Sequence, residues 1–201
     1  GDVYKRQKLL SIERMKNLLV SLMLAFVCAG ASAQQTAIKT NLLYDATRSV
    51  NLGLEVGLAT HWTFDLSANY NPWSYSNHRK LKHLLVQPEA RYWFCEQFNG
   101  HFIGMHAHWA KFNVGGLKMP FGLWEELRNR RYEGDLYGFG FTYGYQWMLN
   151  RHWNIEAAIG LGYAHIIYDR YPCADCGTRQ KGGHKNYLGP TKAALSLVYL
   201  F

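Results

Sequence analysis

The chain has 201 residues, of which 48% are hydrophobic and 15% aromatic, and its formal net charge is +8. The part that follows residue 33 is long enough for one domain and contains no apolar run that could form a transmembrane helix. If this part enters a membrane, it must do so as a closed sheet, because only helices and closed sheets pair every backbone polar group in lipid.

The first 33 residues are interpreted as two segments that precede the folded domain. Residues 1–14 match nothing later in the chain and include the string DVYKRQ, which resembles a translated sequencing adaptor, so we interpret them as an artefactual extension. Residues 15–33 have the parts of a secretory signal peptide: a positive start, an apolar run of 12 residues and the cleavage site Ala31-Ser32-Ala33. We therefore predict a single exported domain over residues 34–201.

Eight stretches of this domain alternate between large apolar residues and small or polar ones, which is the period of a β-strand. They are residues 36–44, 50–59, 62–70, 85–94, 102–112, 135–148, 153–168 and 187–201. Eight strands are the smallest number that closes into a barrel with an interior filled by side chains.

The clearest strand signal is LYGFGFTYGYQW at 136–147. One face of this stretch is aromatic, and the other is Gly, Thr and Gln without a charge. That alternation is typical of a transmembrane β-strand, with its aromatic face toward lipid and its small polar face toward the lumen. A soluble sandwich or a lipocalin-like barrel, with inside and outside reversed, is the alternative that this one stretch leaves open.

The connections between the predicted strands alternate in length after a compact first loop at 45–49. The short ones are 60–61, 95–101 and 149–152, and the long ones are 71–84, 113–134 and 169–186. Outer-membrane barrels have short periplasmic turns and longer external loops. We therefore predict an all-β fold, an eight-stranded antiparallel up-and-down transmembrane barrel of the outer-membrane type, with both termini in the periplasm.

Several long strings carry a family resemblance over essentially the whole predicted domain. They are IKTNLLYDAT (38–47), YNPWSYS (70–76), VQPEARYWFCEQFNGHF (86–102), FNVGG (112–116), YGYQW (143–147) and HKNYLGPTKAALS (184–196). Together they resemble the Bacteroidota outer-membrane β-barrel family described as domain of unknown function 3575. The resemblance implies a small secreted barrel with no assigned activity, often encoded near fimbrillin-like surface proteins, and it supplies no catalytic residues.

Charged residues on the faces opposite the aromatic stripes are expected to point into the barrel. They are Lys39, Glu55, Asp65, Glu89, Arg91, Glu156 and Lys192. Because buried charges need partners, we predict a network of salt bridges that fills the interior. A narrow pore is the alternative interpretation of the same residues.

His106 and His108 stand two apart on one predicted strand, so both point inward. The pair suggests an alternative function, an outer-membrane lipid-modifying enzyme in which a histidine activates a hydroxyl. No serine motif accompanies the pair and two ligands do not complete a zinc site, so polar interior residues are the favoured interpretation. We predict no catalytic residue, no metal and no cofactor.

Cys173 and Cys176 lie in the predicted connection before the last strand. In an exported protein they are expected to form a local disulfide, and a zinc knuckle completed by ligands from elsewhere is the alternative.

Basic residues gather in the predicted long loops. Outer-membrane lipid, lipopolysaccharide phosphates, glycan and surface fimbrial proteins are therefore the expected partners, and nucleic acid is not. We predict a non-enzymatic outer-membrane protein with a structural or surface-interaction role, as an accessory to fimbria-like assemblies.

Overall fold

The computed structural model describes residues 35–75, 79–115, 131–171 and 180–201, and residues 35–201 belong to one compact unit. The predicted extension and signal peptide lie outside the described residues. The strands are β1 (Thr36–Asn41), β2 (Val50–Ala59), β3 (Trp62–Asn71), β4 (Ser74–Tyr75), β5 (Arg79–Trp93), β6 (Gly100–Gly115), β7 (Arg131–Met148), β8 (Trp153–Tyr171) and β9 (Gln180–Leu200), and α2 (Leu42–Ala46) is a short helix. No helix in the described part of the chain is long and apolar enough to cross a membrane.

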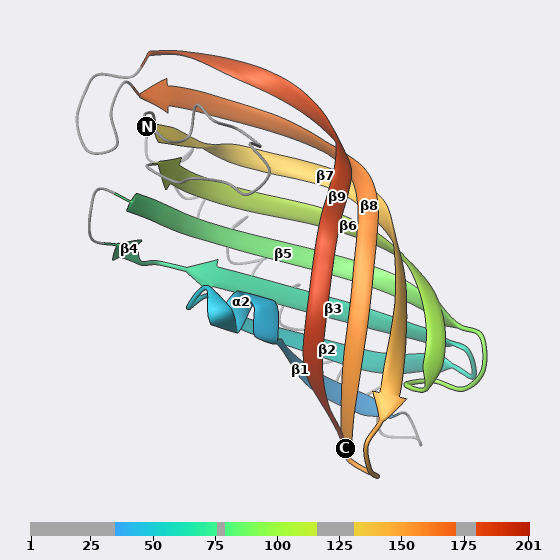
Figure 1. Cartoon of the computed structure of the whole chain (residues 1–201). Coiled ribbons are helices and arrows are strands. Elements are labelled where there is room, and N and C mark those ends of the chain that lie inside the picture. Colours follow the sequence, from blue (N-terminus) through green and yellow to red (C-terminus); the bar gives the residue numbers. More distant parts are fainter. Residues whose placement is uncertain (1–34, 76–78, 116–130, 172–179) are drawn as a thin grey trace, which may run out of the picture. The chain divides into compact units, whose positions relative to one another are not determined.

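Eight antiparallel strands, β1–β3 and β5–β9, form one sheet that closes in a ring (Figure 1). Each strand pairs with its neighbour in the chain, β9 pairs with β1, and β3 pairs with β5. The two-residue strand β4 adds only to the end of β5. The predicted all-β fold with eight antiparallel strands is thus confirmed.

The strands are longer than the alternation predicts, so the predicted long connections are partly wrong. β5 begins at Arg79, β7 at Arg131 and β9 at Gln180, inside the stretches expected to be loops. In these extensions backbone pairing continues, as between His83 and Phe112, although the side chains no longer alternate between apolar and polar. Backbone hydrogen bonds can extend a hairpin even where neither face of the sheet is apolar. The apolar–polar alternation of the side chains therefore ends before the strand does.

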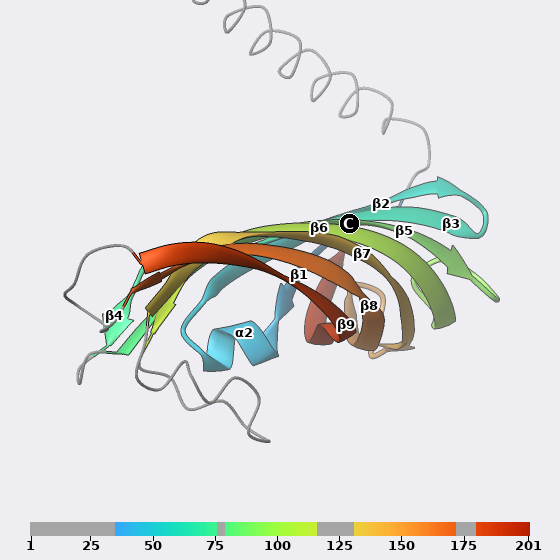
Figure 2. The same cartoon turned by 90° about the horizontal axis from the view of Figure 1, so that it is seen from above.

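The first predicted strand is wrong at its end, because β1 stops at Asn41 and α2 follows (Figure 2). The side chain of Asn41 caps the helix by accepting a hydrogen bond from the Leu43 backbone N–H at 3.1 Å. The same side chain donates to the Ala193 carbonyl at 3.1 Å and accepts from the Leu195 N–H at 3.2 Å, so it extends the pairing of β1 with β9.

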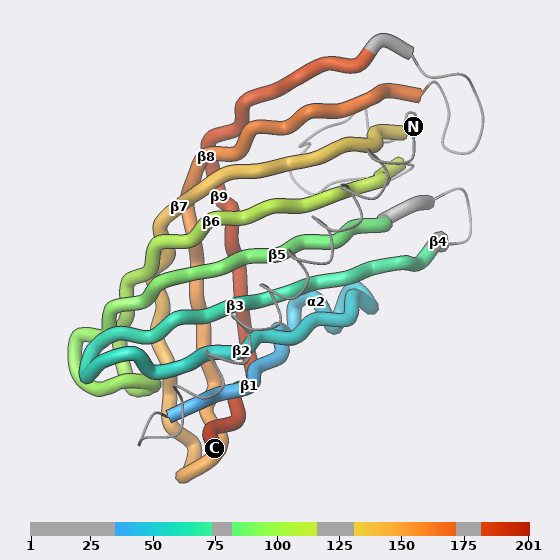
Figure 3. The backbone as a smooth tube through the Cα atoms, turned by 180° about the vertical axis from the view of Figure 1, so that it is seen from behind, coloured from blue at the N-terminus to red at the C-terminus, as the bar shows by residue number. Residues whose placement is uncertain are grey.

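The upper part of β9 runs far beyond the end of β1 (Figure 3). Within the described residues, the stretch of β9 before Ala193 pairs with β8 only. Pro190 and the bulge beside it make this edge a poor template for another strand.

The two faces of the sheet differ in the way that the alternation predicts. On β7, Phe139 and Phe141 are 57% and 66% exposed, whereas Gly140 and Thr142, which alternate with them, are buried. The buried face of the ring carries most of the buried charged and amide side chains of the described residues. The ring therefore has an apolar exterior and a largely polar core.

Candidate functional site

One rung of the sheet carries three acidic residues across adjacent strands. Glu55 on β2 lies opposite Asp65 on β3, Asp65 lies opposite Glu89 on β5, and Glu89 lies opposite His106 on β6. Residues directly opposite one another share a face, so all of these side chains enter the ring, where they are at most 1% exposed. Like charges at neighbouring positions repel, so this rung requires cations inside the ring.

Arg91 supplies the central positive charge and is completely buried. Its Nε lies 2.6 Å from Glu89 Oε1, and its Nη1 lies 2.7 Å from Glu156 Oε2 and 2.9 Å from Glu55 Oε2. Its Nη2 lies 3.3 Å from Asp65 Oδ2. The planar guanidinium has five N–H donors, which lets one side chain bind four carboxylates.

Two lysines complete the group. Lys39 Nζ on β1 contacts Glu55 and lies 3.3 Å from both Asp65 Oδ1 and Glu156 Oε2. Lys192 Nζ on β9 lies 2.8 Å from Glu89 Oε2 and 3.8 Å from Asp65 Oδ2. The structure thus brings together all seven residues of the predicted network, and we call them the charged layer. They come from six strands, and their contacts tie distant parts of the ring to one another.

His106 extends the charged layer through two threonines. Its Nδ1 lies 2.9 Å from Thr142 Oγ1, its Nε2 lies 3.0 Å from Thr191 Oγ1, and the Thr142 hydroxyl donates to Glu89 Oε2 at 2.8 Å. Because the Thr142 hydroxyl gives its proton to Glu89, it accepts the Nδ1–H of His106. Thr191 reaches His106 because it is the extra residue of a bulge, between Pro190 and Lys192, which pair with Leu161 and Gly160.

His108 lies beside His106, with ring centroids 5.6 Å apart, but the two histidines have different surroundings. His108 Nδ1 is buried and makes no hydrogen bond with the described residues. Glycines on β7 lie beside both rings, since a Cβ at Gly138 would lie 2.7 Å from His108 Nε2 and one at Gly140 would lie 2.8 Å from His106 Nε2. At both positions the added Cβ would lie even closer to a backbone carbonyl oxygen of β8, that of Tyr163 or of Leu161. Glycine is therefore needed there for the close approach of β8 as well as for the space of the histidines.

An aromatic layer, formed by Trp93, Phe98 and Phe102, lies next to the charged layer at the end of the ring with the short connections. The Trp93 ring centroid is 4.8 Å from that of Phe102 and 6.0 Å from that of Phe98, and all three side chains are at most 1% exposed. Arg91 lies over the Phe102 ring at 4.5 Å. Sequence analysis missed this layer, although the position of Trp93 two residues after Arg91 was a signal that it points inward.

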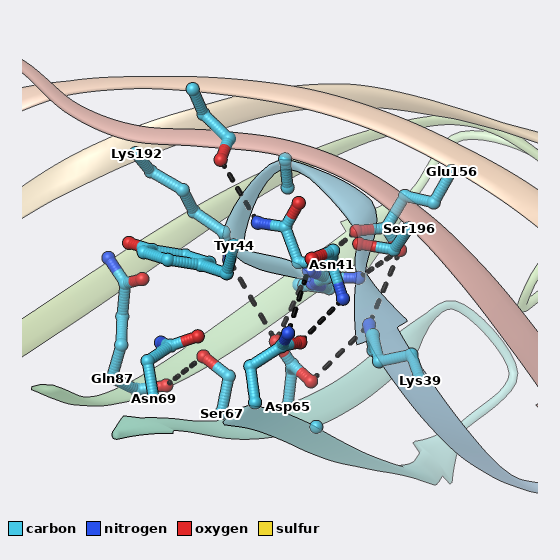
Figure 4. Close-up of a pocket in the computed structure, with 15 residues that line it drawn as sticks. Lys39, Asn41, Tyr44, Asp65, Ser67, Asn69, Gln87, Glu156, Lys192 and Ser196 are labelled. Carbon is cyan, nitrogen blue, oxygen red and sulfur yellow. Dashed lines mark hydrogen bonds and ion pairs between the residues drawn. The ribbon is translucent and has the colours of Figure 1, made fainter. Parts of the chain in front are cut away.

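A polar cavity of about 30 Å³ lies among the interior side chains (Figure 4). Asn41, Asn51, Ser67, Asn69 and Gln87 line it with amides and hydroxyls, and Asp65, Lys39, Arg91, Glu156 and Lys192 line it with charges. Two buried atoms of this lining, Asp65 Oδ1 and Gln87 Nε2, make no hydrogen bond with the described residues, although Asp65 Oδ1 lies 3.3 Å from Lys39 Nζ. The cavity is therefore polar and incompletely satisfied.

Comparison with known proteins gives a family. Residues 18–201 match the family model described as "Protein of unknown function (DUF3575)". The chain belongs to the DUF3575 family. No curated protein matches it. Family membership therefore adds no catalytic or binding residue, and in this DUF3575 protein the candidate site rests on the interior geometry alone.

The remaining predicted positions of this DUF3575 protein concern its cysteines and metals. Cys173 and Cys176 lie outside the described residues, so their disulfide stays a prediction. Cys95 is a free, exposed cysteine in the connection before β6. Within the described ranges, no three His, Cys, Asp or Glu side chains are grouped so that they can hold a metal ion.

Proposed function

We propose that the ring is an eight-stranded up-and-down barrel of the outer membrane, exported by the predicted signal peptide, with both termini at the periplasmic end. The observation that carries this proposal is the outward face of β7, where residues from Tyr137 to Trp147 alternate outward and are mostly about half exposed. Ten residues cover about 33 Å along a strand, or about 25 Å across a bilayer for a tilt of about 40°. That height equals the apolar band of outer-membrane barrels.

Aromatic residues at both limits of the band support the same proposal. Trp62, Trp147 and Trp153 lie at the end with the short connections and are 48%, 47% and 41% exposed. Tyr70, Trp109 and Tyr137 lie toward the other end and are 52%, 43% and 46% exposed. Exposed Trp and Tyr in two girdles are typical of membrane–water interfaces, where an apolar ring and a polar tip are both accommodated.

The role that we propose for this barrel is structural and surface-interacting rather than catalytic. The interior supports this role, because the charged layer binds its own members and the aromatic layer fills the adjacent cross-section, which disfavours a pore. Outer-membrane lipid surrounds the barrel. Lipopolysaccharide phosphates, glycan or fimbrial surface proteins bind at its outer end, where it acts as an accessory to fimbria-like assemblies.

Membrane location is tested by fractionation and by gel mobility. The protein is expected in the outer-membrane fraction, and an unheated sample is expected to migrate faster than a boiled one, because a closed barrel resists detergent until it is heated. Recovery as a periplasmic monomer that dissolves without detergent contradicts the proposal.

The lipid-facing band is tested by Phe141→Arg. Arginine near the middle of the lipid face is expected to lower the free energy of unfolding in lipid vesicles by about 2–4 kcal/mol. Thr60→Arg is the matched control, because Thr60 is exposed in the two-residue connection between β2 and β3, outside the band. Equal effects of the two changes contradict a lipid-facing position for Phe141.

A lipid-modifying enzyme is the second candidate function, and one observation favours it. The Thr191 hydroxyl lies 3.0 Å from His106 Nε2, and His106 is held by the Thr142–Glu89 pair, so the arrangement is that of a hydroxyl beside a positioned base. The purified protein is tested for release of fatty acid from phospholipid and lipid A vesicles. Release that is lost in Thr191→Val, with the gel shift retained, would replace the structural role by this one.

A further inference from the structure

An apolar groove of about 530 Å³ lies on the outer face of the ring, and we call it the outer groove. Two rungs of outward side chains form its walls. One rung consists of Trp62, Tyr92, Ile103, Tyr143 and Ile159, and the other consists of Ala90, Met105, Phe141 and Leu161. Binding sites for small molecules are mostly apolar hollows of about 300–1,000 Å³, so the outer groove has the size of a ligand site.

Small residues create the outer groove. Ala90 places only a methyl group on the outer face of β5, opposite Met105, which is 59% exposed. Gly104 and Thr142, which occupy inward-facing positions between the two rungs, form the floor. The groove is therefore built into the strands, and no movement of the backbone is needed to open it.

The outer groove slopes from an aromatic girdle into the apolar band. Trp62 begins β3 and belongs to the girdle at the end with the short connections. Ile159, at the β8 end of the groove, lies six residues beyond Trp153 of the same girdle. Six residues cover about 20 Å along a strand, or about 15 Å across a bilayer for a tilt of about 40°. This depth is half of a hydrocarbon core of about 30 Å, which is the depth of one leaflet.

Hydrogen-bond donors lie at the girdle end of the outer groove. The indole N–H of Trp62 and the phenolic O–H of Tyr92 belong to adjacent side chains, whose ring centroids are 5.2 Å apart. At the β8 end, Ile159 and Leu161 are 57% and 59% exposed and have no polar side-chain atom. No Asp or Glu is among the described residues that line the groove. The groove therefore fits a ligand with an apolar chain and a head that accepts hydrogen bonds.

Tyr143 adds one further donor on the same wall. Its hydroxyl lies 2.7 Å from His101 Nδ1. In a neutral pair, one proton is used in this hydrogen bond and one donor stays available, either the His101 Nε2–H or the Tyr143 O–H. The wall formed by the first rung can thus donate to phosphate or ester oxygens, whereas the wall formed by the second rung offers only apolar side chains.

We propose that the outer groove binds one phospholipid of the periplasmic leaflet. Its acyl chain packs against Ile159 and Leu161, and its phosphate or ester oxygens accept hydrogen bonds from Trp62 and Tyr92. This inference rests on the proposed outer-membrane location and adds a defined lipid site to the lipid that surrounds the barrel. A second copy of the chain fits less well, because donors at one end of the groove and none at the other match an amphiphile.

The test counts the phospholipid molecules that stay bound to the purified full-length protein in detergent. Dipalmitoyl phosphatidylethanolamine is titrated into the protein, and native mass spectrometry measures the bound fraction. We expect one phospholipid per barrel, with a signal that saturates. A protein that retains no phospholipid overturns the proposal.

Ala90→Phe locates the lipid, because the larger side chain fills the outer groove. Ala68→Phe is the matched control, since Ala68 is exposed on β3 and does not line the groove. We expect the bound phospholipid to be lost in Ala90→Phe and kept in Ala68→Phe, with the gel shift of a closed barrel retained in both. Equal retention in the two variants overturns the proposal.

A variant that combines Trp62→Phe with Tyr92→Phe tests the head-group contacts, and it decides the question if Ala90→Phe does not fold. Both rings stay, but the N–H and O–H donors are removed. The phospholipid concentration at half saturation is expected to rise about tenfold, which corresponds to about 1.4 kcal/mol. An unchanged concentration at half saturation overturns the proposed contacts and with them the assignment of the groove.

The same measurements separate a second copy and a failure of the membrane location. A dimer that forms without added phospholipid and is lost in Ala90→Phe assigns the outer groove to a second copy and overturns the lipid. A protein that fractionates with the outer membrane but retains no phospholipid defeats this inference alone. Recovery as a soluble periplasmic monomer defeats the membrane location and this inference with it.

Discussion

The charged layer and the aromatic layer occupy neighbouring cross-sections of one ring, and they fill it by different physics. In the charged layer, Arg91 alone contacts four carboxylates, so each group depends on the presence of the others. In the aromatic layer, Trp93, Phe98 and Phe102 pack by shape, and no member has to be matched by an opposite charge. Loss of one group is therefore expected to affect the whole charged layer, whereas in the aromatic layer its effect is expected to stay local.

Arg91→Met should have the largest effect on stability. The change keeps most of the side-chain volume but leaves four buried carboxylates with only two lysines, and removal of one member of a buried ion pair costs about 3–5 kcal/mol. Because four acids lose their shared partner, we expect the upper end of this range, about 5 kcal/mol, as a loss of unfolding free energy in urea.

Lys192→Met provides the comparison for Arg91→Met. Lys192 contacts only Glu89 and Asp65, so its loss is expected to cost clearly less than the loss of Arg91. Equal losses of unfolding free energy in the two variants would mean that the charged layer does not depend on one central residue. The two layers would then not differ in the way described above.

Phe102→Ala should follow in size. Truncation of a buried phenylalanine costs about 3–5 kcal/mol through lost burial and the cavity that remains. We expect about 3 kcal/mol, because Arg91 and Trp93 border the vacated space and can relax into it. Phe94→Ala is the matched control, since Phe94 is 53% exposed on the outer face. In detergent its cost should be small, and a cost equal to that of Phe102→Ala would contradict a packed aromatic layer.

The sequence was sufficient to predict which charged residues enter the ring, but not how they pair there. Period-2 alternation places Glu55, Asp65 and Glu89 on the face opposite the apolar stripe, so their inward direction follows from their positions. Their shared contact with Arg91 depends on the register between strands, and so on turn geometry and ring closure, which alternation does not determine.

Other features of the site left no comparable signal in the sequence. Phe98 lies in the connection between β5 and β6, where a residue would be expected to face water, but its side chain is buried in the interior. Its backbone φ is +59°. Thr191 reaches His106 only because a bulge shifts it onto the inner face. Both depend on local departures from regular strand geometry, which the two-residue alternation of a sequence does not indicate.

Thr63→Val should cost less than Arg91→Met and Phe102→Ala, and it tests whether the two layers are coupled. Thr63 is fully buried, its hydroxyl donates to Glu55 in the charged layer, and it accepts a hydrogen bond from Trp93 Nε1 at 2.9 Å in the aromatic layer. Valine has nearly the same shape but leaves the indole N–H and one carboxylate oxygen without this partner, and an unsatisfied buried group costs about 1–3 kcal/mol. We expect a loss of about 2 kcal/mol in the free energy of unfolding.

The decisive measurement is a double-mutant cycle that combines Thr63→Val with Phe102→Ala and with Lys192→Met. If Thr63 links the layers, its cost should depend on the presence of either partner change, because each alters one side of the bridge. If the changes in unfolding free energy of the single variants add up in both cycles, Thr63 does not couple the layers. The charged layer and the aromatic layer would then be two separate cores.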